Sequence, residues 1–301
     1  MKIIVQGLGK MGSQIAHKLT EDQHQVIVVN RSPEPVEKAK QFGAIPATNK
    51  QNAISYFNSE QVIIWLMLPA DIIKSQVDEW LKILPKNSLI IDGGNSDFRN
   101  TQKLATYIEN NNNTMIDIGT SGGIYGYKNG FSMMVGSNNF NNFKLIKPIL
   151  ISLTKPAGAY NYFGKAGSGH FVKMTHNAIE YGMMESLAEG YNFLKNGPYQ
   201  EIDLAKVADV WQHHSVITSW LNELCYDILK TNPELNNIEG YVSESGEARW
   251  TLEAAKDTNI SMPAISAAFN VRLNSQKGQI NFATKLLAAM RNSFGGHKLN
   301  K

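Results

Sequence analysis

The 301-residue sequence predicts an α/β protein in which a doubly wound, mostly parallel sheet is followed by an all-helical domain. Three observations carry this prediction. Short apolar runs alternate with helical patterns through the first half of the chain, a glycine-rich turn joins the first run to the first helix, and only helical periodicity remains beyond residue 164. We therefore expect a sheet domain over residues 1–164 and a helical domain over residues 165–301.

Residues 2–6 form a β-branched run, followed by GLGKMG (residues 7–12) and a helical pattern. A GxGxxG motif between a strand and a helix is typical of a Rossmann-type dinucleotide-binding domain. Its first glycine makes the turn, the second lets a pyrophosphate approach the backbone, and the third lets helix and strand pack closely. The helix N-terminus would supply amide groups to the phosphates.

The next strand, residues 25–29, ends at Asn30, Arg31 and Ser32. NAD enzymes usually place an acidic residue here for the ribose hydroxyls, and none is present. A guanidinium and a hydroxyl suit a 2′-phosphate instead, so we favour NADP over NAD. The alternative is that Arg31 is a solvent-facing side chain.

Further strands are expected at residues 62–68 and 88–91, with helices at 71–83 and 97–110 around them. The loop DGGNS (residues 92–96) follows one of these strands, at the edge where open α/β sheets bind ligands. A plain turn is the alternative reading of this loop.

A strand at residues 115–118 leads to the loop GTSGG (residues 119–123), whose amides and serine hydroxyl suit a carboxylate or a phosphate. Strands at residues 131–135 and 157–163 complete the expected sheet. Helical patterns follow at residues 203–230, 246–257, 263–274 and 279–292.

A long apolar helix begins after the small-residue turn at residues 164–169, and it carries Lys173, His176, Asn177 and Glu180 on one stripe. An otherwise apolar helix is buried on most sides, so the stripe is interpreted as the wall of a polar ligand cleft. A solvated helix face is the alternative. Lys173 and Glu180 lie about 10 Å apart along the axis, which suits a base and an acid acting on different atoms of one substrate.

Composition excludes several classes of function. The chain has 43% apolar and 18% charged residues and a formal charge of +3, without a basic run, which predicts no nucleic-acid partner. Its apolar runs are too short to span a bilayer, so no membrane association is expected. The single cysteine, Cys225, is interpreted as a core residue of a cytoplasmic protein.

The motifs GLGKMG, DGGNS, TSGG, GKAGSGHFVKMTHNAIEYG and RNSFGGH together resemble the short form of the decarboxylating 6-phosphogluconate dehydrogenases, over nearly the whole chain. The resemblance implies that Lys173 is the general base and Glu180 the later general acid. It implies a substrate site formed by Asn95, Ser121, Gly122, Gly123, His176, Asn177, Tyr181, Arg249, Arg272, Arg291 and His297. Residues expected at the coenzyme are Gly7, Gly9, Lys10, Met11, Gly12, Asn30, Arg31, Ser32, Met67, Leu68 and Asn95.

The resemblance also implies the reaction. Lys173 would take the proton of the C3 hydroxyl of 6-phosphogluconate as a hydride leaves C3, and the resulting keto acid would lose carbon dioxide and become ribulose 5-phosphate. No metal is expected. The C-terminal arginine and histidine of the family reach a partner subunit, which implies a homodimer or a dimer of dimers. Ala248, His214 and Thr218 depart from the family pattern, which bears on the placement of Arg249.

Two alternatives remain open. A β-hydroxyacid dehydrogenase for a small unphosphorylated acid would share the nucleotide motif, the SGG loop and the helical lysine. Separately, arginines in a helical domain are usually rim residues that pack their stems, which is the alternative reading of Arg249, Arg272 and Arg291. A nucleotide-sensing protein without catalysis would require a broken catalytic pair, whereas Lys173 and Glu180 are both present.

Overall fold

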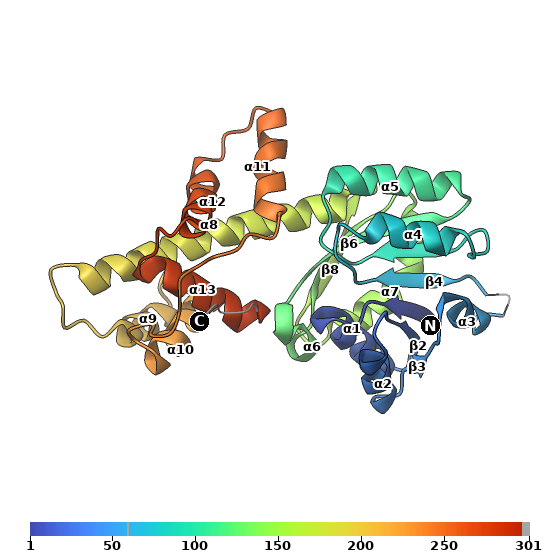
Figure 1. Ribbon diagram of the computed structural model, residues 1–301, viewed down its shortest axis with the longest axis horizontal. Coiled ribbons are helices and arrows are strands. Elements are labelled where there is room, and N and C mark those ends of the chain that lie inside the picture. Colours follow the sequence, from blue (N-terminus) through green and yellow to red (C-terminus); the bar gives the residue numbers. More distant parts are fainter. Residues whose placement is uncertain (59, 297–301) are drawn as a thin grey trace. The chain divides into compact units, whose positions relative to one another are not determined.

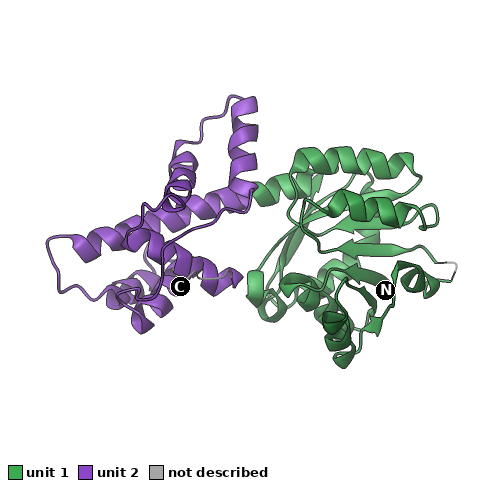
Figure 2. Ribbon diagram, in the orientation of Figure 1, with its two compact units in different colours: residues 1–174 green, residues 175–301 purple. Residues whose placement is uncertain are grey.

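The computed structural model describes residues 1–58 and 60–296 (Figure 1). The chain divides into two compact units, residues 1–174 and 175–301 (Figure 2). The division falls inside helix α8 (Ser168–Asn196), so the first turns of that helix belong with the sheet. The expected boundary after residue 164 stays a prediction.

Unit 1 contains an eight-stranded sheet within its described residues, in the order β3-β2-β1-β4-β5-β6-β7-β8. The strands are β1 Lys2–Gln6, β2 Gln25–Val29, β3 Ile45–Pro46, β4 Ile63–Leu66, β5 Leu89–Asp92, β6 Thr114–Ser121, β7 Ser132–Gly136 and β8 Ala159–Gly164. Neighbouring strands run parallel except β6 and β7, which are antiparallel. The predicted fold class, a mostly parallel doubly wound sheet followed by helices, is confirmed.

Some strand boundaries differ from those expected. β3 was not predicted, because a two-residue edge strand is too short to show a period. β6 continues to Ser121, so this serine ends the strand instead of lying in the loop after it. β4 ends at Leu66, which places Met67 and Leu68 in the turn that follows.

Helices cover both faces of the sheet (Figure 1). In unit 1 they are α1 Lys10–Glu21, α2 Pro33–Gln41, α3 Lys50–Ser55, α4 Ile73–Leu81, α5 Phe98–Asn110, α6 Gly126–Asn129 and α7 Phe140–Thr154, with a 3-10 turn at Gly123–Tyr125. One face packs against α1, α2 and α7, and the other packs against α3, α4 and α5.

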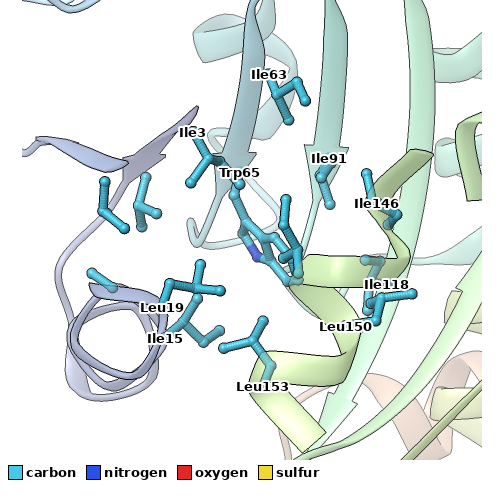
Figure 3. Packing of buried hydrophobic residues seen from close by; sticks show 14 of the residues in the cluster. Ile3, Ile15, Leu19, Ile63, Trp65, Ile91, Ile118, Ile146, Leu150 and Leu153 are labelled. Carbon is cyan, nitrogen blue, oxygen red and sulfur yellow. The ribbon is translucent and has the colours of Figure 1, made fainter. Parts of the chain in front are cut away.

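Successive residues of β4 serve these two cores alternately. Ile63 and Trp65 join the core beneath α1 and α7, where Ile15 and Leu150 contribute from the two helices (Figure 3). Ile64 joins the opposite core. Burial of each such side chain stabilises the fold by about 1.5–3 kcal/mol. Packing on both faces fixes the strands in the sheet, so their carboxyl ends lie at one edge of it.

Unit 2 contains helices joined by loops and no strand among its described residues. It combines the later part of α8 with α9 Leu204–Gln212, α10 Trp220–Thr231, α11 Glu247–Asp257, α12 Pro263–Ser275 and α13 Phe282–Gly295. The pattern expected as one helix over residues 203–230 is two helices. The break is stable because Ser219 caps α10, accepting a hydrogen bond from the backbone N–H of Asn222. No helix in the described part of the chain is both long and apolar enough to cross a membrane.

Candidate active site

The glycine turn between β1 and α1 is shaped by two of its three motif glycines. Gly7 has φ +94°, and a Cβ added there would lie 2.3 Å from the carbonyl oxygen of Met67. A Cβ on Gly12 would lie 1.9 Å from the carbonyl oxygen of Gly7. A Cβ on Gly9 would meet nothing within 4 Å. The fold therefore requires glycine at residues 7 and 12. At residue 9 the space next to the backbone is open, so the fold itself does not require glycine there.

Gly9 is also the N-cap of α1, and no side chain caps that helix end. The first amides of a helix carry partial positive charge and lack partners within the helix, so this end suits a pyrophosphate. Lys10 is exposed and Met11 half-buried at the same end. The residues present thus fit a dinucleotide.

Asn30 stabilises this turn from the end of β2. Its Oδ1 accepts a hydrogen bond from the backbone N–H of Leu8 at 3.0 Å, and its Nδ2 donates to the carbonyl oxygen of Ser32 at 3.1 Å. The Asn30 amide is therefore engaged with the backbone. Arg31 and Ser32 are both exposed just before α2.

Met67 and Leu68 lie directly against Gly7, which brings the turn after β4 next to the glycine turn. The Met67 sulfur accepts a hydrogen bond from Nε1 of Trp65 at 3.0 Å. A Cβ on Gly93 would lie 2.0 Å from that same Nε1, so the turn after β5 packs on the turn after β4.

Asp92 organises the loop after β5, a role that the sequence did not reveal. The residue is buried, its Oδ1 accepts a hydrogen bond from the backbone N–H of Gly94 at 3.0 Å, and its Oδ2 accepts one from Oγ of Ser96 at 3.1 Å. Burial raises the pKa of the Asp92 carboxyl. Asn95 is exposed in this loop.

The loop after β6 turns through two glycines with positive φ, +135° at Gly122 and +52° at Gly123. Ser121 and both glycines are half-buried. Lys173 approaches the same strand from α8, because a Cβ added to Gly119 would lie 2.2 Å from the Cβ of Lys173. The Lys173 side chain is only 6% exposed. Lys173 is thus a buried lysine whose Cβ contacts the strand that leads into this loop, and its role as a general base stays a prediction.

The polar stripe lies on a single unbroken helix, as its spacing predicted. Nδ1 of His176 and Oδ1 of Asn177 are 2.9 Å apart, and Nδ2 of Asn177 donates to Oε1 of Glu247 at 3.0 Å. Glu180 is half-buried. Glu247 is a buried carboxylate that sequence reasoning missed. Its only signal is its place in the first turn of α11.

Arg272 is the most deeply buried cation of unit 2 among the described residues, at 1% exposed. Its Cζ lies 3.2 Å from the centroid of the Tyr181 ring, and its Nη2 is 3.5 Å from the sulfur of Met184. Its Nη1 is buried and has no hydrogen-bond partner. Burial lowers the pKa of Arg272 to about 10, yet the side chain stays charged at neutral pH.

Arg291 is buried as well, and its Nη1 donates to Oγ of Ser243 at 2.8 Å. Burial lowers its pKa, and each of the two arginines lies within the other's electrostatic reach, since the charge of Arg291 also lowers the pKa of Arg272. Two buried cations that repel one another, one with an unused donor, form a site that an oxyanion would stabilise.

The remaining predicted residues are placed differently. Arg249 is exposed at the start of α11, where it pairs with Glu244, while its neighbour Ala248 is fully buried. His297 lies outside the described residues. In the described part of the chain, no group of three or more His, Cys, Asp or Glu side chains is arranged to hold a metal ion.

Comparison with known proteins gives matches over both units. Residues 2–164 match the NAD binding domain of 6-phosphogluconate dehydrogenase, and residues 169–301 match the C-terminal domain of the same enzyme. The Bacillus subtilis protein YqeC, whose own assignment as a 6-phosphogluconate dehydrogenase is provisional, is 36% identical over 100% of both chains. An NAD(+)-dependent, decarboxylating 6-phosphogluconate dehydrogenase of Haloferax volcanii is 31% identical over 99% of this chain and 98% of that protein.

Solved structures show the same fold. The 6-phosphogluconate dehydrogenase of Plasmodium falciparum superposes with a TM-score of 0.81 at 23% identity, covering 96% of this chain and 70% of that one. The 3-hydroxyisobutyrate dehydrogenase of Mycobacterium tuberculosis superposes with a TM-score of 0.74 at 18% identity, covering 96% and 99%. At these identities the likeness concerns the fold alone.

Proposed function

The chain belongs to the 6-phosphogluconate dehydrogenase family of oxidoreductases, and we propose that it oxidises and decarboxylates 6-phosphogluconate to ribulose 5-phosphate and carbon dioxide. The observation that carries the choice of substrate is the unused Nη1 of Arg272. A buried guanidinium donor without an acceptor is costly, and a phosphate oxygen would satisfy it.

Arg291 supports the same assignment. Its guanidinium is buried and held by Ser243, and its charge reaches Arg272. A phosphate carries up to two negative charges and therefore offsets the repulsion between two arginines better than a neutral hydroxyl does. A small unphosphorylated acid would leave Nη1 of Arg272 without an acceptor.

Lys173 is proposed as the general base. A nicotinamide coenzyme, when bound at the glycine turn, supplies a hydride acceptor for the substrate. The neutral amine of Lys173 takes the proton of the C3 hydroxyl, so C3 becomes a ketone and the amine becomes an ammonium ion. Lys173 is buried, and its Cβ lies against Gly119 of β6.

Decarboxylation then follows from the 3-keto acid, because the electrons of the breaking carbon–carbon bond move into the enolate. The Lys173 ammonium ion stabilises the enolate oxygen. Glu180 donates a proton to the carbon that becomes C1 of ribulose 5-phosphate. The helix fixes these two side chains seven residues apart, about 10 Å along its axis, so each addresses a different carbon.

We propose NADP as the preferred coenzyme, with NAD as the alternative. β2 ends without an acidic side chain, Asn30 is engaged with the backbone, and Arg31 is exposed beside the N-terminus of α2. A 2′-phosphate at this position would contact the guanidinium of Arg31 and the hydroxyl of Ser32. The relative from Haloferax volcanii is named as NAD(+)-dependent, which makes this a point to measure.

We also propose a homodimer, which can pair further into a dimer of dimers, in the cytoplasm. Large apolar side chains are exposed on unit 2, among them Phe193, Val210 and Ile260, each more than 60% exposed. A second subunit that covered these side chains would remove their apolar area from water. Sedimentation equilibrium would measure the state, and a monomer would contradict the proposal.

The test of the reaction is a spectrophotometric assay of coenzyme reduction, with 6-phosphogluconate, unphosphorylated gluconate and 3-hydroxyisobutyrate offered in turn with each coenzyme. We expect turnover with 6-phosphogluconate and release of one carbon dioxide per reduced coenzyme. The kcat/KM should be lower by at least about 100-fold for the unphosphorylated acids, since they leave Nη1 of Arg272 unpaired. Turnover of 3-hydroxyisobutyrate alone would support the alternative, a β-hydroxyacid dehydrogenase.

A further inference from the structure

Helix α8 starts against the sheet without a side-chain cap of its own. Gly167 precedes the helix with φ +92° and carries no side chain. The acceptor comes from β6, fifty residues earlier in the chain. Oδ1 of Asp117 accepts a hydrogen bond from the backbone N–H of Gly167 at 2.7 Å, and its Oδ2 accepts one from the backbone N–H of His170 at 2.9 Å.

Asp117 is fully buried, at 0% exposed, in the middle of the sheet. β6 is hydrogen-bonded to β5 on one side and to β7 on the other, so the backbone of Asp117 has little freedom to move. The two carboxylate oxygens therefore fix the start of α8 to a rigid strand. Amides at a helix N-terminus attract a negative charge, which adds to the two hydrogen bonds.

Small residues let the helix come this close. A Cβ on Gly136 would lie 2.6 Å from Oδ1 of Asp117, and a Cβ on Gly169 would lie 2.4 Å from the carbonyl oxygen of Met134. A Cβ on Gly119 would lie 2.2 Å from the Cβ of Lys173. The helix thus rests on the strands at several points along its first two turns, and its rotation and height are determined there.

Asp117 and Gly119 lie on the same face of β6, because alternate residues of a strand share a face. The cap contact and the Lys173 contact are therefore neighbours on one strand. We infer that Asp117 is a positioning residue for Lys173: its carboxylate fixes the start of α8, so it sets where the base of the Lys173 side chain meets Gly119, and it places a negative charge two residues away on the same face of β6. The inference rests on the proposed role of Lys173 as the base.

The test replaces Asp117 by asparagine, which keeps the shape but removes the charge and one acceptor. We expect D117N to lower kcat by about 10-fold or more, since a shift of about 1 Å in a catalytic group costs up to about 100-fold. The KM for the coenzyme should change by less than about 2-fold, because the glycine turn is not touched. D203N is the matched control: Asp203 also accepts from two helix amides, those of Ala205 and Lys206, but it caps α9. It should leave kcat unchanged.

A second readout does not depend on the substrate. With lysine labelled with ¹³C at Cε, the Lys173 signal is assigned by its absence in Lys173→Met and is followed against pH. Loss of a nearby negative charge disfavours the ammonium ion, so the midpoint should fall in D117N by about half a pH unit and stay unchanged in D203N. This separates the inference from the proposed function, which fails only if wild-type protein does not turn over 6-phosphogluconate.

Folding of each variant is checked by circular dichroism. If D117N does not fold, the same readouts are taken on Asp117→Ser, whose smaller hydroxyl can accept one amide. A folded variant whose kcat and Lys173 midpoint both equal those of wild type would overturn the inference and leave Asp117 as a cap alone.

Discussion

Glu185 offers a quantitative test of how burial acts in unit 2. The side chain lies on α8 and is 6% exposed, and its Oε2 has no hydrogen-bond partner. Burial raises the pKa of this carboxyl from 4.5 to about 7, the charge of Glu189 adds to the rise, and the charge of Arg272 opposes it. The substitution to test is Glu185→Gln, which removes the titration and keeps the size.

The direction in which pH changes the free energy of unfolding follows from proton binding by Glu185. Between pH 4.5 and about 7 the folded protein holds the Glu185 proton while the unfolded chain has lost it. The unfolded state then binds fewer protons, so the free energy of unfolding falls as pH rises through this range. A shift of about 2.5 units at about 1.36 kcal/mol per unit gives about 3 kcal/mol. Water that reaches the ionised carboxylate reduces the penalty, and we expect about 2 kcal/mol.

The assay is urea unfolding of wild type and E185Q near pH 5 and near pH 8. We expect the stability of E185Q relative to wild type to increase by about 2 kcal/mol between the two conditions. Glu201→Gln, at an exposed position, is the control and should show no such change. An equal difference between E185Q and wild type at both pH values would refute the reasoning.

Three further predictions concern catalysis and recognition. Lys173→Met should lower kcat by at least about 100-fold while the Kd for NADP, from a fluorescence titration, stays within about 2-fold of wild type; near-normal turnover would remove Lys173 as the base. Arg272→Lys should raise the KM for 6-phosphogluconate by about 10-fold with a smaller change in kcat, because an ammonium ion cannot replace a planar guanidinium stacked on Tyr181. An unchanged KM would argue against a phosphate contact. Arg31→Ala should raise the KM for NADP by about 10-fold and leave that for NAD unchanged, so equal effects on both coenzymes would contradict a 2′-phosphate contact.

The sheet could be predicted from the sequence because its signals are local. β1, the glycine turn and α1 follow one another within the first 21 residues, and β4 is a continuous apolar run. β3 was missed because two residues show no period. The break between α9 and α10 was missed because both helices are amphipathic and the intervening residues contain no glycine or proline to mark it.

The polar stripe was predictable for the same reason: helical spacing alone places Lys173 and Glu180 on one face of α8. Contacts between segments that lie far apart in the sequence could not be predicted. The stacking of Arg272 on Tyr181 joins residues that lie 91 positions apart, and the Asp117 cap joins a strand to a helix fifty residues later. The ion pair of Arg249 with Glu244 likewise depends on the path of the loop before α11, which no periodicity encodes.

The three motif glycines differ in what they guarantee. Substituting Gly7 or Gly12 would push a new methyl group into backbone atoms, so any descendant of this protein must keep both merely to fold. Gly9 faces open space, so the fold itself would accept a side chain there, and the proposed coenzyme is what would exclude one. In a relative that no longer bound a coenzyme, we would therefore expect the glycine equivalent to Gly9 to be replaced first. The glycines equivalent to Gly7 and Gly12 would be kept because the fold requires them.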